Sequence, residues 1–303
     1  MVGVVQEEEA GSSSEESLSP WEVLLQGGDQ EHLALTLPSA RPVLGNIAIA
    51  LDLIAHPLTQ IRLRVAGPMT PNELATVACL SSAFRGLRAS TLLALSGYST
   101  EARTVLRRTY EAAALARMLA HEPVLAEQWL REAQWFPDRK VRKWFGVQAA
   151  PGEERTGYQE HYRYSSAFAH PTVRSTFPLL LTDGESIFPA LRTLQDPTGA
   201  LMALREVMAE AVFVCFAVRN AMVDPALLSP PWHQSLSDLT QAVGLVLPEV
   251  QRHWQETDMT FDRLMESVVP VDELDDVLRA DPNSYANVRR RASGGSETSA
   301  ESG

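Results

Sequence analysis

The stretch YRYSSAFAHP, at positions 162–171, gathers the side chains of this sequence that are best suited to chemistry. Arg163, Ser166 and His170 are spaced three and four residues apart. Seven residues of α-helix fall only about 20° short of two full turns, so the three side chains form one polar stripe if the segment is helical. An imidazole exchanges protons near neutral pH, and a guanidinium can hold a phosphate. The stripe is therefore a candidate functional site.

The end of the same stretch has a second interpretation. Pro171 disfavours helical geometry at His170, which we expect in the last turn of a helix or just beyond it. A helix C-terminus favours the imidazolium form, and so would a neighbouring carboxylate. The histidine could equally be a structural cap, with the serines bonding back to helix carbonyls. The local sequence leaves both roles open.

A second polar group lies upstream, in LRRTYEAAALARML. Arg107 and Glu111 are four residues apart and are neighbours on one helix face, with Arg103 one turn earlier. On a surface such a pair contributes only a few tenths of a kcal/mol. The apolar residues spread so widely around this helix that much of its circumference must be covered, and buried charges need each other or a ligand. We therefore expect Arg107 and Glu111 to be partly buried and to face Ser166 and His170 across a helix pair.

Helix start and stop signals place these side chains on long helices. Thr70, Pro71 and Glu73 form the pattern of a capping box and predict a helix from 71 to about 96. Gly97 is the residue that ends it.

Three more helices follow by the same reasoning. Ser99 as N-cap predicts a helix over 100–121, and Pro123 begins one that reaches about 135. Asp196 as N-cap predicts a helix from Pro197 to about 222, which contains the long apolar segment 201–222.

The overall pattern predicts an all-α protein. Residues 43–55 also show helical periodicity, and strict alternation is rare along the chain. We expect one all-α domain at 20–280, an antiparallel helical bundle of about five long helices with shorter ones attached. Residues 1–19 are acidic, rich in Ser and Gly and poor in large apolar groups, and residues 281–303 look similar after a short basic run. Both stretches are predicted to be disordered tails.

The charge is unevenly distributed. The 303-residue chain has a net charge of −12, yet residues 80–180 hold fourteen lysines and arginines against nine aspartates and glutamates. An acidic protein should not coat nucleic acid indiscriminately, but a locally basic region can hold a phosphate-bearing ligand such as RNA or a nucleotide. A solvated basic face that balances acidic neighbours is the alternative.

Several classes of protein are disfavoured by what the sequence contains. We expect no secretory signal and no membrane span, and hence a cytoplasmic protein, because no window of about 18 residues is both apolar and uncharged. Cys79 and Cys215 have no ligand spacing and are expected to be core residues. His161 and His170 lie nine residues apart, on opposite faces of a helix, and no H-E-x-x-H pattern occurs. We therefore expect no metal and no cofactor.

The pairing of LRRTYEAAALARML with YRYSSAFAHP resembles an uncharacterised bacterial all-helical family, a domain of unknown function with an Arg-x-x-x-Glu helix and a Ser-x-x-x-His-Pro helix end. That family is similar to the HEPN superfamily, helical bundles that often dimerise and include metal-independent ribonucleases of toxin and antiphage systems. Their signature is an arginine, four to six residues and a histidine, which Arg163 and His170 satisfy. The position after the arginine, usually Asn, Asp or His, is Tyr164 here. The resemblance covers roughly 75–222.

This resemblance implies an endoribonuclease. The ribose 2′-hydroxyl would attack its adjacent phosphate, which needs proton transfer and stabilisation of charge but no metal. His170 would move the proton, Arg163 and Arg107 would hold the phosphate, and Glu111 would orient one of these groups. The resemblance further implies a homodimer and a cognate antitoxin or defence partner.

Two other functions are alternatives to RNA cleavage. A non-catalytic nucleotide- or protein-binding regulatory module needs the same basic pocket, with Arg107, Ser166 and Tyr164 as ligand-binding residues, but no proton transfer. Serine hydrolysis through Ser166, His170 and Glu111 is disfavoured, because no G-x-S-x-G elbow or strand precedes the serine.

Overall fold

The structure is a computed structural model of the whole chain. The residues that it describes are 29–64, 68–131, 140–141, 143–144, 180–182, 187–189, 196–222 and 228–266. By its internal contacts the chain divides into two units, Met1–Val250 and Gln251–Gly303. The packing described below belongs to the first unit.

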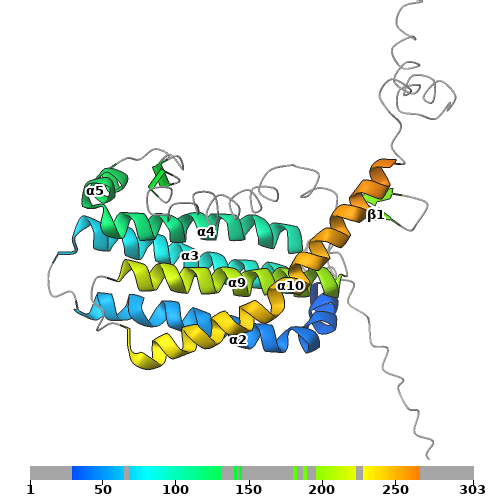
Figure 1. Cartoon of the computed structure of the whole chain (residues 1–303), viewed down its shortest axis with the longest axis horizontal. Helices are drawn as coiled ribbons and strands as arrows, with labels where there is room; N and C mark the ends of the chain where they lie inside the picture. The colour runs from blue at the N-terminus through cyan, green and yellow to red at the C-terminus, as the bar shows by residue number, and fades with distance from the viewer. Residues whose placement is uncertain are drawn as a thin grey trace, which may run out of the picture. The chain divides into compact units, whose positions relative to one another are not determined.

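Helices account for nearly all of the described residues. They are α2 (Asp29–Arg64), α3 (Pro71–Leu95), α4 (Ser99–His121), α5 (Pro123–Arg131), α9 (Pro197–Ala221) and α10 (Pro230–Glu266) (Figure 1). Two three-residue strands, β1 (Leu180–Thr182) and β2 (Ile187–Pro189), pair antiparallel with Leu181 opposite Phe188. Apart from this small hairpin the described part of the chain is all-helical, as its sequence predicts.

Helix α3 begins and ends as its sequence predicts. The backbone N–H of Glu73 donates to Thr70 Oγ1 at 3.3 Å, and the Glu73 carboxylate accepts from the Thr70 N–H at 2.8 Å, which completes the capping box. Gly97 follows the helix with a φ of 85°, a left-handed conformation that costs a glycine little.

Helix α4 begins one residue earlier than predicted. Its N-cap is Tyr98, which makes no side-chain capping bond, and Ser99 is already helical. The predicted cap was wrong because the turn through Gly97 is so tight that the chain re-enters a helix at once. At α9, by contrast, Asp196 caps as predicted, with its Oδ1 accepting from the Gly199 N–H at 2.8 Å.

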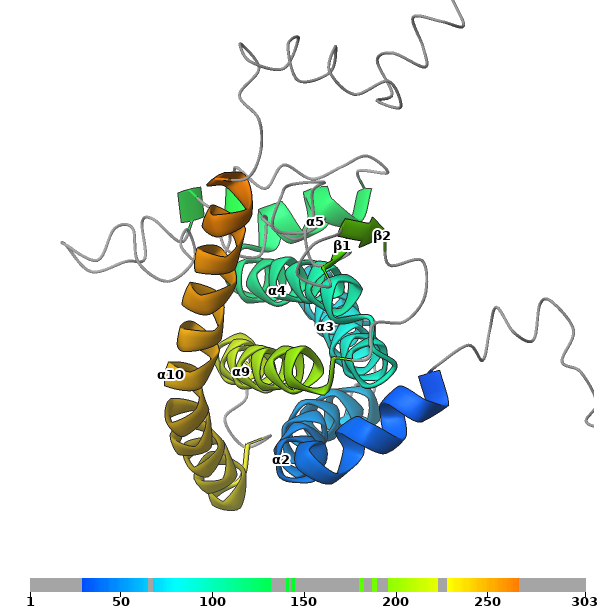
Figure 2. The same ribbon diagram turned by 90° about the vertical axis from the view of Figure 1, so that its right-hand side faces the viewer.

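Helix α2 is much longer than the predicted segment 43–55. Pro38, Pro42 and Pro57 lie inside it. Each removes a backbone donor, and Figure 2 shows the N-terminal part of α2 set at an angle to the rest. Over Gln30–Gln60, α2 is long and apolar enough to cross a membrane. A helix in a protein core passes the same test, and α2 supplies Ile47 to this core.

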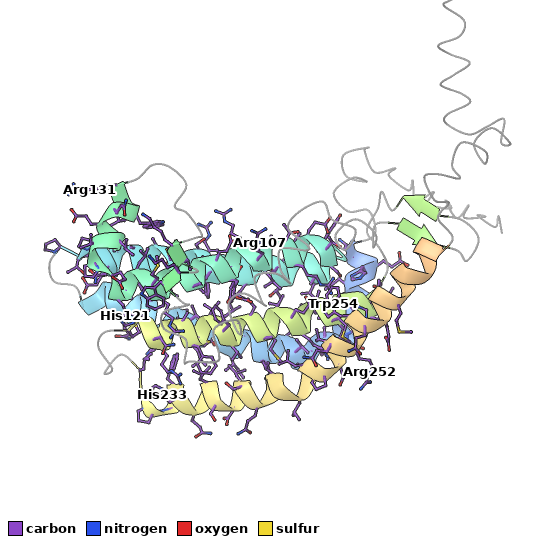
Figure 3. All side chains as sticks on the ribbon, turned by 45° about the horizontal axis from the view of Figure 1, so that its top comes forward. Arg107, His121, Arg131, His233, Arg252 and Trp254 are labelled. Atoms are coloured by element: carbon purple, nitrogen blue, oxygen red, sulfur yellow. The ribbon has the colours of Figure 1, made fainter. Side chains whose placement is uncertain are left out.

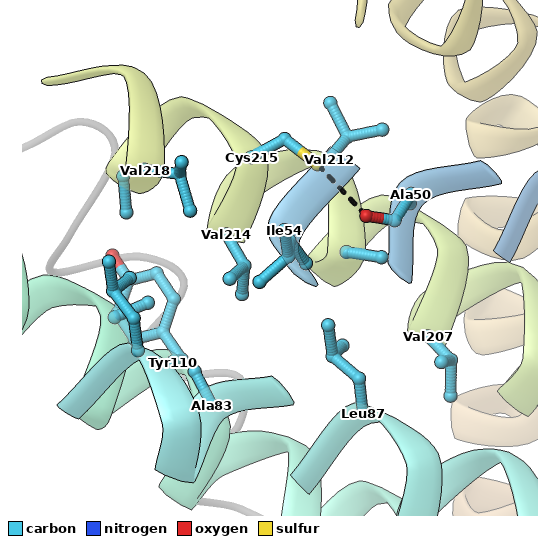
Figure 4. Packing of buried hydrophobic residues seen from close by; sticks show 14 of the residues in the cluster. Ala50, Ile54, Ala83, Leu87, Tyr110, Val207, Val212, Val214, Cys215 and Val218 are labelled. Carbon is cyan, nitrogen blue, oxygen red and sulfur yellow. Dashed lines mark hydrogen bonds between the residues drawn. The ribbon is translucent and has the colours of Figure 1, made fainter. Parts of the chain in front are cut away.

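The core lies among α2, α3, α4 and α9, with the start of α10 added to it. Its largest fully buried side chains include Ile54 of α2, Leu87 of α3, Met118 of α4 and Val214 of α9, and many alanines lie between them (Figure 4). Such small side chains let helix backbones approach closely. Burial of this apolar surface is the main force that holds α4 in place.

Two polar contacts fix neighbouring helices to α2. The Cys215 thiol of α9 donates to the Ala50 carbonyl oxygen at 3.6 Å (Figure 4). The Trp232 indole of α10 donates to the Leu53 carbonyl oxygen at 2.8 Å. Both carbonyls belong to the part of α2 in front of Pro57. Because Pro57 lacks an N–H, the carbonyl of Leu53 loses its usual intrahelical partner, and Trp232 supplies the replacement.

The helix directions correct the expectation of an antiparallel bundle. Helices α3 and α4 are antiparallel, as the short turn between them requires. Helices α4 and α9 run parallel, because contacts advance together along both: Arg103 meets Glu206, Tyr110 meets Phe213, and the His121 ring bonds the Asn220 carbonyl. The long connection from 122 to 196 has enough chain to return to the starting end, which a short loop does not.

Candidate functional site

The residues singled out in the sequence divide into two groups. Arg107 and Glu111 are described, on α4. Arg163, Tyr164, Ser166 and His170 lie outside the described residues, so the predicted meeting of the two groups stays a prediction.

Arg107 and Glu111 form an ion pair along α4. Arg107 Nε donates to Glu111 Oε1 at 3.1 Å. The Arg107 side chain is only 14% exposed and that of Glu111 is 37% exposed. Figure 3 shows Arg107 on α4, in the middle of the helix. The guanidinium is thus the covered member of the pair, and the carboxylate is the more accessible one.

Arg103 serves a different purpose from Arg107, although only one turn separates them. Its Nε donates to both oxygens of Glu206, at 2.9 and 3.2 Å, and its Nη2 donates to Oε1 at 3.0 Å. The two side chains are 8% and 10% exposed. This bidentate pair joins α4 to α9. Arg103 is thus engaged with α9, and Glu206 is a partner that the sequence alone did not reveal.

Two more buried polar side chains, Tyr110 and Glu210, lie further along the same two helices. The Tyr110 ring lies 4.5 Å from the Phe213 ring, and Tyr110 and Glu210 are each 2% exposed. Burial, and then the negative charge of Glu210, raises the pKa of the Tyr110 hydroxyl well above its ordinary value. Tyr110 therefore stays a neutral hydrogen-bonding group. We call Arg103, Tyr110, Glu206 and Glu210 the α4–α9 seam.

Positive charges and aromatic rings meet at the C-terminal ends of α4 and α9. The Arg219 guanidinium lies 4.7 Å from the Phe216 ring centre, and that of Arg117 lies 5.8 Å from the ring centre of Trp144. Burial, and then the charge of Arg219, lowers the pKa of Arg117. The carbonyl ends of two parallel helices favour positive charge, which offsets this repulsion.

A groove of about 440 Å³ opens between α3 and α4. Its lining is mostly small side chains with two arginines: Ala78, Ser81, Ser82, Arg85, Gly86, Ala89, Val105, Arg108 and Thr109. At Gly86 a Cβ atom would fall 3.3 Å from Thr109 Cβ and would collide with the Thr109 hydroxyl. The two helices therefore meet where α3 has no side chain. Sequence reasoning did not find this groove, because it depends on how α3 and α4 pack.

Chemistry that needs a thiolate finds no support in the described residues. Cys79 and Cys215 are both free and buried, and burial raises the pKa of each thiol to about 12. Nor do three or more His, Cys, Asp or Glu side chains gather in a metal-binding cluster anywhere in the described ranges.

No protein-family model, curated protein or solved structure matches the chain.

Proposed function

We propose that this protein binds RNA and cleaves it without a metal ion. The observation that carries the proposal is the partly buried Arg107–Glu111 pair, which holds a guanidinium and a carboxylate within 3.1 Å of each other on α4. The surrounding charge agrees with an anionic ligand, because α3 and α4 together carry six arginines and three glutamates in a chain of net charge −12.

The proposed reaction is attack of a ribose 2′-hydroxyl on the adjacent phosphorus. The new P–O bond forms as the bond to the 5′-oxygen of the next nucleotide breaks, which leaves a 2′,3′-cyclic phosphate and a 5′-hydroxyl end. One proton leaves the 2′-oxygen and one reaches the 5′-oxygen. His170 is the group proposed to move protons, Arg163 and Arg107 to hold the phosphate, and Glu111 to orient them.

The proposal also includes the fold family, the oligomeric state, the location and the partner of the protein. The helices would form a HEPN-like bundle, two copies would pair as a homodimer in the cytoplasm, and the partner would be a cognate antitoxin or defence protein. Light scattering tests the homodimer directly, since a mass of 33.3 kDa in solution would contradict it.

Incubation of the purified protein with total RNA in EDTA tests the reaction. We expect cleavage products with 2′,3′-cyclic phosphate ends, and a loss of roughly 10²–10⁴-fold in rate for His170→Ala. Glu111→Gln should also lower the rate. The matched control is Glu127→Gln, which disrupts a similar i,i+4 pair with Arg131 on α5, where both side chains are more than half exposed. Unchanged cleavage by His170→Ala would overturn the proposal.

A non-catalytic nucleotide-binding module is the second candidate. The α3–α4 groove favours it, because the groove presents two exposed arginines on a surface of small side chains. RNA or nucleotide binding without any cleavage product in the same incubation would select this function over the first.

A further inference from the structure

We propose that the groove between α3 and α4 is a binding site for a phosphate monoester of nucleotide size, with the phosphate held between Arg85 and Arg108. The inference deepens the second candidate function, and it does not rest on the proposed ribonuclease because it uses none of the residues assigned to that reaction. Every residue that lines the groove belongs to α3 or α4.

The packing of the two helices places both arginines at one level of the groove. Gly86 of α3 lies directly against Thr109 of α4. Arg85 and Arg108 each precede one of these contact residues. Since the helices are antiparallel and rise about 1.5 Å per residue, the two Cα atoms are offset along the helix axes by only about 3 Å. Two long side chains that start at one level on opposite sides of a groove can reach the same anion.

No described residue neutralises Arg85 or Arg108. Both are exposed, and within the described residues neither makes an ion pair or a hydrogen bond through its side chain. Other arginines of the same helices differ, because Arg103 is bound to Glu206 and Arg107 to Glu111. Two unneutralised guanidiniums that border one groove favour a ligand with about two negative charges.

A phosphate monoester meets that requirement better than a carboxylate or an internal phosphodiester. It carries about −1.5 to −2 charges at neutral pH and three acceptor oxygens, whereas the other two groups carry one charge each. Each guanidinium can donate two parallel hydrogen bonds to such an anion.

The groove also has room for more than a phosphate. Its volume of about 440 Å³ lies within the range of sites that hold small organic molecules. Ser81 and Ser82 line it about one helical turn from Arg85, and their hydroxyls can bond the polar edge of a sugar or base. Ala78, Ala89 and Val105 supply apolar surface for the remainder of the ligand.

Calorimetric titration of the full-length protein with adenosine 5′-monophosphate tests the site. We expect saturable binding that adenosine does not show, and roughly tenfold or greater weakening for Arg85→Gln or Arg108→Gln alone. Inorganic phosphate should compete with the nucleotide. Circular dichroism spectra establish that the variants keep their helices.

Arg88→Gln is the matched control, since Arg88 is an exposed arginine one turn further along α3 that does not line the groove. Its affinity should equal that of the parent protein. The proposal is overturned if adenosine binds as tightly as its phosphate, if the double variant Arg85→Gln/Arg108→Gln binds normally, or if Arg88→Gln weakens binding equally. A 5′-hydroxyl RNA oligonucleotide that binds through both arginines more tightly than the monoester would point to RNA instead. His170→Ala separates the two proposals, because it should stop RNA cleavage and leave nucleotide affinity unchanged.

Discussion

Two arginines one turn apart on α4 show how a small rotation changes the role of a side chain. Arg103 and Arg107 differ by about 40° around the helix axis, since four residues exceed one turn by that amount. That rotation directs Arg103 to Glu206 of α9 and leaves Arg107 to pair along its own helix with Glu111. The first pair joins two helices, and the second stays within α4.

The effects of replacing Arg103 and Glu206 on the free energy of unfolding should be strongly coupled. Arg103→Met leaves a carboxylate in a site where it is only 10% exposed, so we expect a loss of about 3–5 kcal/mol in the free energy of unfolding. Arg103→Met/Glu206→Met removes both charges and should cost much less than the sum of the two single changes. Urea denaturation of the four proteins measures the coupling. Simple additivity would show that the pair does not contribute as a unit.

The burial of the two cysteines predicts how the free energy of unfolding changes at alkaline pH. Each buried thiol has its pKa raised from 9.0 to about 12, so the folded protein holds these protons more tightly than the unfolded chain does. Their contribution is complete below pH 9 and is lost as the pH rises from 9 towards 12. In Cys79→Ala/Cys215→Ala the decline over this window should be shallower than in the parent. Identical slopes would mean that the thiols ionise alike in both states.

A faster measurement on the same cysteines uses a thiol reagent. At pH 8 the folded protein should react slowly, because both thiols are buried and neutral, and two equivalents should react in denaturant. Rapid labelling of the native protein would contradict their burial.

At the level of elements, the turn between α3 and α4 determines how the two helices that line the groove pack against each other. Gly97 reverses the chain within three residues, which makes α3 and α4 antiparallel and sets the contact of Gly86 with Thr109. That contact fixes the groove. The ends of the two helices differ chemically, since α3 has a complete capping box and α4 has no side-chain cap.

This difference gives a paired prediction for helix caps. Thr70→Ala removes the acceptor of the Glu73 N–H and should lower the free energy of unfolding by about 1 kcal/mol. Ser99→Ala changes a residue that is already inside α4, where alanine is the better helix former, and should cost less than about 0.5 kcal/mol. Chemical denaturation compares the two. Equal losses would indicate that Ser99 also caps a helix.

At the level of the whole molecule, the described core is contained in the first unit. Each buried member of the apolar cluster lies before Val250, from Ala40 of α2 to Val243 of α10. A chain that ends at Val250 keeps this cluster intact, although it divides α10 in sequence.

We therefore expect residues 1–250 to fold cooperatively by themselves. Their thermal midpoint, followed by circular dichroism, should lie within a few degrees of that of the full chain, because the buried apolar surface of the cluster is unchanged. A broad, non-cooperative transition would show that residues after Val250 are needed for folding.

The sequence by itself determined the helical class and the ends of α3 and α9. Capping and chain reversal are local events, so Thr70, Gly97 and Asp196 act through bonds and backbone angles a few residues away. Arg107 and Glu111 could be paired from their spacing for the same reason, since opposite charges four residues apart are neighbours on one helix face. The proposed roles of four residues stay predictions from the sequence, because the residues lie outside the described part of the chain: Arg163, Tyr164, Ser166 and His170.

Only the tertiary structure decided which distant residues meet. Three features depend on how whole helices pack. They are the parallel directions of α4 and α9, the burial of Arg103 against Glu206, and the positions of Arg85 and Arg108 along one groove. That packing is set by many apolar contacts summed over helix faces, none of which has a fixed spacing in sequence. A single sequence therefore shows which residues can do chemistry, whereas the packed helices show which of them share a surface.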